Sequence, residues 1–135
     1  MLKSVATTTD LEMLVWIAGL TAIMWVPYIL AHVMKHGVVE ALTYRADSVP
    51  LEGWAARAKK AHYNAIENLV PFAALVLVAH VTTATNEATA AACIAFFWAR
   101  AAHYVLYISG IPFGRTITFT IGWAAMFCIF WQIVT

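Results

Sequence analysis

The chain has 135 residues, of which 63% are hydrophobic and 11% are charged, and its mean hydropathy is +0.78. Soluble domains carry about 45–50% apolar and about 25% charged residues, so this composition indicates an integral membrane protein. The formal net charge of +1 argues against nucleic acid as a partner, because nucleic-acid binding requires a strongly basic patch or stripe.

The first long apolar segment, about residues 10–35, is predicted to be a transmembrane helix that stays in the membrane as an anchor. Thr9 precedes Glu12 by three residues just before the apolar run, which is the pattern of a capping box with Thr9 as the cap. Pro27 lies inside the segment and predicts a kink, because proline removes one backbone hydrogen bond. Gly37 is the expected stop.

Three further apolar segments follow the first. Residues 38–53 contain charged residues, a proline and a glycine without a clear period, which predicts a loop with at most one surface turn. Pro71 predicts a bend in the second helix, and either Thr85 or Asn86 is expected to cap the third. The sequence predicts one all-α domain over residues 1–135, an integral membrane four-helix bundle in antiparallel, up-and-down order, with helices at about 10–35, 54–81, 87–108 and 112–134.

Small residues mark the third predicted helix. Alanines recur there at three- and four-residue spacing, which lets membrane helices approach closely, so we expect a packing face. The two cysteines, Cys93 and Cys128, fall inside apolar segments and are interpreted as packing residues rather than a disulfide or metal pair. The alanines are Ala88, Ala91, Ala92, Ala95, Ala99 and Ala102.

Positive charge is unevenly divided between the two sides of the predicted membrane. Cations gather around the first and third connections, whereas the opposite side holds only Lys3. By the positive-inside rule, these two connections are expected to be cytoplasmic and both termini to lie on the other side. The gathered cations are Lys35, Arg45, Arg57, Lys59, Lys60 and Arg115.

A polar stripe opens the second helix. Lys60, Asn64 and Glu67 are spaced i, i+4 and i+7, so they share one helix face, and Arg57 lies one turn earlier on the same side. An ionised side chain inside a membrane costs about 2.5–3.5 kcal/mol on insertion scales. Glu67 is therefore expected to meet a cation, a donor or water inside a bundle rather than lipid.

A second stripe ends the third helix and a third cluster begins the fourth. Arg100, His103 and Tyr107 share one face, and Arg115 with Thr116 follows the next turn. All three clusters are expected at the same depth, where an excess of buried cations favours a small anionic ligand, although an internal salt-bridge and amide network would use the same residues. A guanidinium at a helix start would also favour a thiolate over a thiol, and Thr116 would add a hydrogen bond. The alternative for Arg115 is an arginine that only reaches from the membrane edge to the headgroups and marks the topology.

The five histidines raise b-type haem as an alternative, because imidazoles from facing transmembrane helices can ligate it. His32 and His36 are four residues apart on the first helix. However, His36 and His62 lie near the interface, and His80 lies near the opposite end of the second helix. We therefore expect neither haem nor a metal.

Three motifs together resemble the MAPEG superfamily, the membrane-associated proteins in eicosanoid and glutathione metabolism. The likeness spans essentially the whole chain and is greatest to the bacterial branch and to microsomal glutathione transferases. Where characterised members begin the motif of the second helix with arginine, this chain has Lys60. The motifs are Lys60-x-x-x-Asn64-x-x-Glu67, Arg100-x-x-His103-x-x-x-Tyr107 and Arg115-Thr116.

The resemblance implies a homotrimer of four-helix protomers, located in a bacterial inner membrane, that binds glutathione as cosubstrate between subunits near the cytoplasmic face. The implied reaction is attack of the glutathione thiolate on a lipophilic electrophile or hydroperoxide from the bilayer. The alternative is a non-catalytic trimer that binds a lipid or another anionic ligand through the same cluster. By this likeness Lys35, Lys60, Asn64, Glu67, Arg100, His103 and Tyr107 bind glutathione, and Arg115 and Thr116 act on its thiol.

Overall fold

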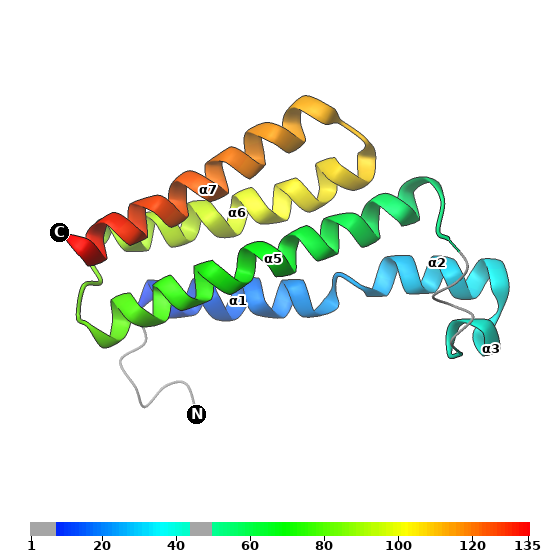
Figure 1. Cartoon of the computed structure of the whole chain (residues 1–135), viewed down its shortest axis with the longest axis horizontal. Coiled ribbons are helices and arrows are strands. Elements are labelled where there is room, and N and C mark those ends of the chain that lie inside the picture. Colours follow the sequence, from blue (N-terminus) through cyan, green and yellow to red (C-terminus); the bar gives the residue numbers. More distant parts are fainter. Residues whose placement is uncertain (1–7, 44–49) are drawn as a thin grey trace.

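The computed structural model describes residues 8–43 and 50–135, and this part of the chain is helical apart from its turns. Within it, four stretches are long and apolar enough to cross a membrane. The first of them is interrupted, and the chain then returns and crosses twice more alongside itself (Figure 1). The elements are α1 (Thr9–Ile23), α2 (Val26–His36), α3 (Val38–Ala41), α5 (Gly53–Val81), α6 (Glu87–Ser109) and α7 (Pro112–Val134).

The first span breaks between α1 and α2, as the predicted kink required. Pro27 explains the position, because its ring clashes with the carbonyl group four residues earlier, that of Ile23, where α1 ends. The hydroxyl group of Tyr104 on α6 donates to the backbone carbonyl oxygen of Met24 over 2.9 Å. This contact satisfies an acceptor that the break leaves without a helical partner.

The predicted cap of α1 is wrong by one residue. Thr8 is the N-cap, and its Oγ1 accepts a hydrogen bond from the backbone N–H of Leu11 over 3.4 Å. Leu11 therefore occupies the third helical position that the predicted capping box gave to Glu12 after Thr9. At the end of α2, the prediction is confirmed, since Gly37 terminates the helix with a φ of 89°.

The connection after α2 begins with one helical turn, in agreement with the predicted loop with at most one surface turn. Gly37 leads directly into this four-residue helix, α3. Residues 44–49 lie outside the described part of the chain, as do Lys3 and Arg45, which entered the orientation argument. α5 then begins one residue before the expected start and continues through Pro71 to Val81.

The apolar core lies in the half of the bundle where α6 begins. Phe72 of α5 and Phe96 of α6 are buried there, and their rings stack with centroids 3.7 Å apart. Cys93 is buried in the same core as a free thiol. Of the alanines on α6, the protomer buries Ala92 and Ala99 and exposes Ala88, Ala91, Ala95 and Ala102.

Asn86 fixes the start of α6 and decides between the two predicted caps. Its Oδ1 accepts from the backbone N–H groups of Ala88 (2.8 Å) and Thr89 (3.1 Å). The Thr89 hydroxyl accepts from the backbone N–H of Asn86 over 2.9 Å, which completes a capping box. The Asn86 Nδ2 also donates to Oε1 of Gln132 over 2.7 Å, so the same residue ties α6 to the end of α7.

We expect Asn86→Ala to lower the free energy of unfolding by about 1–2 kcal/mol, because it removes both an N-cap and a tie to α7. Thermal unfolding in detergent, followed by circular dichroism, measures the change. Thr82→Ala in the same turn is the control, since the Thr82 hydroxyl bonds only to Val78 of its own helix. Equal unfolding temperatures for Asn86→Ala and this control would contradict the assigned cap.

Candidate functional site

The polar stripe of α6 points into the bundle. Arg100 and His103 are only 2% and 3% exposed, and Tyr107, one turn further, is half-buried. α7 lies against this stripe at Gly122, where a Cβ atom would lie 3.4 Å from Cδ of Arg100. The side chains of α6 are therefore covered by α7 on one side.

The Arg100 guanidinium is incompletely paired. Its Nη2 donates to Oδ1 of Asn64 on α5 over 2.5 Å. Its Nε and Nη1 are buried without a hydrogen-bond partner among the described residues, and no described carboxylate lies within ion-pair distance. A buried charge without a partner is destabilising by several kcal/mol, so Arg100 favours binding of an anion.

His103 is held against the first turns of α7. Its Nδ1 lies 3.0 Å from the backbone carbonyl oxygen of Arg115 and 3.3 Å from Oγ1 of Thr118. The imidazole also lies beside the rings of Tyr107 and Phe119, at centroid distances of 5.6 and 6.2 Å. Thr118 and Phe119 were not predicted as site residues, although they lie three and four residues after Arg115 and so share its helix face.

Arg115 lies in the first turn of α7, which starts at Pro112 without a side-chain cap. Its guanidinium carbon is 4.7 Å from the centroid of the Tyr107 ring, a cation–π contact that connects α7 to α6. The unbonded N–H groups of the first turn add partial positive charge to that of the side chain. Thr116 beside it is exposed, and its hydroxyl donates to the Pro112 carbonyl oxygen over 3.2 Å.

These side chains line an open cavity of about 250 Å³ between α5, α6 and α7. Its lining combines a guanidinium, an imidazole, a phenol, an amide and a hydroxyl group and contains no carboxylate. Arg100 lies next to it through its hydrogen bond with Asn64. The structure thereby brings predicted residues of three helices to one place. The lining residues are Asn64, His103, Tyr107, Arg115, Thr116 and Phe119.

The remaining predicted residues lie away from this cavity. Lys60 and Glu67 are exposed on the surface of the protomer, although they share α5 with Asn64. Lys35 is exposed and forms an ion pair of 3.5 Å with Glu52. The expectation that Glu67 meets a partner inside the bundle is therefore not fulfilled within one protomer, because the other helices cover only part of the circumference of α5.

Arg57 supports the fold instead of the cavity. Its Nε donates to the backbone carbonyl oxygen of Ile108 over 2.8 Å. Its guanidinium also packs against Gly110, which ends α6 with a φ of 77°. A cation at a helix C-terminus is favourable because it pairs with unsatisfied carbonyl groups. Arg57 is thus a cap of α6.

The histidines outside the cavity have other contacts. His32 and His36 lie on α2 with ring centroids 4.8 Å apart. Nδ1 of His62 forms a hydrogen bond of 2.9 Å with the hydroxyl group of Tyr28. Among the described residues, no three His, Cys, Asp or Glu side chains are grouped closely enough to hold a metal ion.

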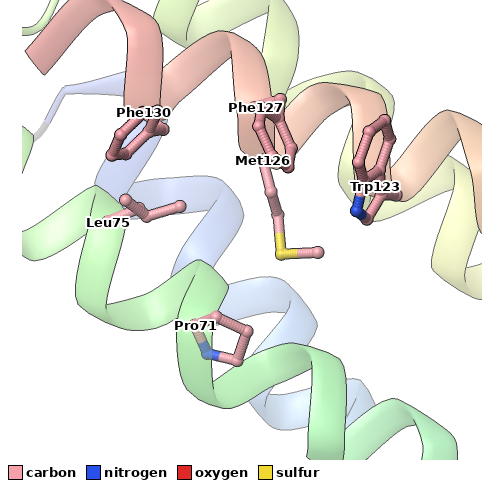
Figure 2. A pocket seen from close by; sticks show the side chains of 6 residues that line it. All are labelled: Pro71, Leu75, Trp123, Met126, Phe127 and Phe130. Atoms are coloured by element: carbon pink, nitrogen blue, oxygen red, sulfur yellow. The ribbon is translucent and has the colours of Figure 1, made fainter. Parts of the chain in front are cut away.

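A larger cavity, of about 440 Å³, is lined by residues of α5 and α7. The side chains at its edge are apolar and aromatic and come from both helices (Figure 2). Trp123 follows Phe119 by four residues and Pro71 follows Asn64 by seven, so the same faces of the two helices line both cavities. The lining residues are Pro71, Leu75, Trp123, Met126, Phe127 and Phe130.

Comparison with known proteins gives one match. The model of the MAPEG family matches residues 13–135, which include all nine predicted site residues. Searches of curated proteins and of solved structures gave no match. With four apolar helices of membrane-spanning length and a family match over nearly its whole length, the chain is an integral membrane protein and belongs to the MAPEG family.

Proposed function

We propose that the protein is a glutathione-dependent membrane transferase or peroxidase, in which the glutathione thiolate attacks a lipophilic electrophile or hydroperoxide. The observation that carries the proposal is that Arg100 is incompletely paired among the described residues and lies beside a cavity whose described lining contains Arg115 and no carboxylate. Glutathione has two carboxylates and one ammonium group, so it brings the negative charge that this site lacks. Membership of the MAPEG family, which includes glutathione transferases and peroxidases, supports the same conclusion.

The arrangement suggests separate roles for the two arginines. Arg100, positioned by Asn64, would bind a carboxylate or carbonyl group of the tripeptide through charge-assisted hydrogen bonds. Arg115 would stabilise the thiolate, because both its guanidinium and the N-terminus of α7 favour negative charge. His103 and Tyr107 line the space between them.

We place this cavity at the subunit interface of a homotrimer. Glu67 is exposed on the surface of the protomer. At the rise of an α-helix it lies about 21 Å along α5 from Gly53, so on an isolated protomer it would contact lipid. A neighbouring subunit that covers this face would bury Glu67 and Lys60 next to the ligand. The Glu67 carboxylate would then receive the ammonium group of glutathione. Lys35 would contribute from the end of α2.

The apolar cavity would hold the lipophilic part of the second substrate. It opens on the membrane-spanning surface between α5 and α7, and the chain offers no charged group in its lining. A substrate dissolved in the bilayer would enter there and present its reactive atom toward Phe119 and Arg115. With the first and third connections on the cytoplasmic side of a bacterial inner membrane, glutathione would reach the polar cavity from the cytoplasm.

Binding of glutathione to the detergent-purified protein tests the proposal. We expect calorimetry to show saturable binding with a dissociation constant below about 1 mM, accompanied by thiolate absorbance at a lower pH than for free glutathione. S-Methylglutathione is the matched ligand control, because it should bind without giving a thiolate signal. Absence of binding at millimolar glutathione would contradict the proposed function.

A further inference from the structure

We propose that His103 is the proton acceptor for the glutathione thiol, through Nε2, and that Thr118 is a positioning residue that keeps the imidazole in the required tautomer. The inference rests on the proposed function, because it assigns the group that takes the thiol proton. Neither role follows from the positive charges of Arg100 and Arg115.

The contacts of Nδ1 determine where His103 carries its proton. The Arg115 carbonyl oxygen, 3.0 Å away, can only accept a hydrogen bond, so Nδ1 must donate to it. The Thr118 hydroxyl can give its own proton to the carbonyl oxygen of Gly114 at 2.8 Å or of Arg115 at 3.1 Å, which leaves a lone pair to accept from Nδ1 at 3.3 Å. The Arg115 carbonyl group therefore requires hydrogen on Nδ1 and the Thr118 hydroxyl can accept it, which leaves Nε2 as the basic nitrogen.

Nε2 of His103 is the ring nitrogen that no contact within the described residues occupies. It is buried and has no hydrogen-bond partner among the described residues, although the imidazole lines the polar cavity. Buried polar atoms without a partner are uncommon in native structures, so this one requires an explanation. A hydrogen-bond donor on a ligand in the cavity, such as a thiol, would provide the missing partner.

The two guanidinium groups near His103 oppose an imidazolium but stabilise a thiolate, so they act in opposite directions on the two products of the proton transfer. The charged and titratable groups that face His103 are Arg100 and Tyr107 from α6 and Arg115 from α7, whereas α5 contributes the neutral Asn64. An imidazolium in the empty site would add a third positive charge to two guanidinium groups. Transfer of the thiol proton leaves the total charge unchanged and creates a thiolate next to these cations.

The proposed step is balanced without a further reactant. The S–H bond breaks, its electron pair stays on sulfur, and the proton moves to Nε2 of His103. The thiolate next to Arg115 then forms a carbon–sulfur bond with the electrophile. The electron pair of the bond that breaks at carbon goes to the leaving atom in a substitution, or to the neighbouring atom in an addition to a double bond. The imidazolium finally returns its proton to that atom or to water.

His103→Asn tests the assignment, because the asparagine amide can still donate to the Arg115 carbonyl group but has no basic nitrogen. We expect glutathione to bind, and turnover at about pH 6.5 to fall about 100-fold, the low end of typical general-base effects. The deficit should shrink above about pH 9.5, since a thiol with an ordinary pKa of about 8.5 ionises there without help. A role in folding alone would not produce this pH dependence.

Thr118→Val provides a second variant in case His103→Asn does not fold. We expect turnover near pH 6.5 to fall about 2–10-fold, the equivalent of one hydrogen bond, with the same recovery at high pH. Thr120→Val is the matched control and should behave as wild type. Thr120 lies on the same helix and bonds back to Thr116 over 2.9 Å, but it is exposed.

The outcomes separate this inference from the proposed function. Failure of the wild-type protein to bind glutathione would overturn the proposed function. Binding with the same pH profile for wild type, His103→Asn and Thr118→Val would overturn the role of His103 only. A third outcome is that His103→Asn loses glutathione binding while Thr118→Val and Thr120→Val have the same turnover and pH profile. This would make His103 a binding residue and would also overturn the inference.

Discussion

Arg115→Ala is expected to lower turnover of a glutathione conjugation reaction by about 10²–10³-fold, the usual effect of removing one group that stabilises developing negative charge. The side chain supplies the guanidinium nearest the start of α7, whereas His103 is held by the backbone carbonyl group of Arg115, which alanine retains. The variant should therefore stay folded and keep the imidazole in place. Steady-state kinetics with an aromatic chloride activated by nitro groups measures the loss.

Arg115→Lys and the oligomeric state serve as controls for this prediction. Lysine keeps the charge without the planar fork, so we expect an intermediate rate. Size-exclusion chromatography with light scattering should show that Arg115→Ala assembles as the wild type does. Loss of assembly with Arg115→Ala would favour the alternative of a non-catalytic membrane protein. An unchanged rate would show that Arg115 does not act on the thiol.

Arg100→Met is expected to weaken glutathione binding at least ten-fold, by about 1.5–3 kcal/mol, because it removes charge-assisted hydrogen bonds to the ligand. The same change should leave the free energy of unfolding equal or higher, since it replaces an incompletely paired buried cation with an apolar side chain of similar length. Calorimetry with glutathione and thermal unfolding in detergent measure the two effects. If Arg100 instead supported the fold, Arg100→Met would lower the free energy of unfolding and leave the affinity for glutathione unchanged.

Arg57→Met is the matched control for Arg100→Met. Arg57 caps the C-terminus of α6 through Ile108 and does not line the polar cavity. We expect this variant to unfold at a lower temperature while its affinity for glutathione stays unchanged. If Arg100→Met instead lost stability and kept its affinity, the anion-binding role of Arg100 would be wrong.

Much of the fold could be predicted because a membrane span is specified locally. Length, apolar composition and polar interruptions fixed the α5, α6 and α7 boundaries to within one residue, and Pro27 indicated the break in the first span. The error in the cap of α1 concerns a detail that depends on the neighbouring turn. The choice of Thr8 over Thr9 depends on backbone geometry, and the sequence offered both threonines.

The candidate site was only partly predictable because helical spacing gives the face of each residue on its own helix. It does not say which helices meet. Asn64, His103, Tyr107, Arg115 and Thr116 come together in the structure, whereas Lys60 and Glu67 on the stripe of Asn64 face outward from the protomer. Thr118 was missed because a threonine that bonds back to its own helix has no distinctive pattern in the sequence.

The sequence by itself determined that this is a four-span helical membrane protein with three polar clusters, because the bilayer restricts the chain to long helices and makes every polar interruption visible. Only the tertiary structure decided which residues of these clusters contact one another. Among the described residues, it gives two nitrogens of Arg100 no hydrogen-bond partner and places a carbonyl group beside Nδ1 of His103. Those relations depend on the packing of α5, α6 and α7, which periodicity along one helix does not encode.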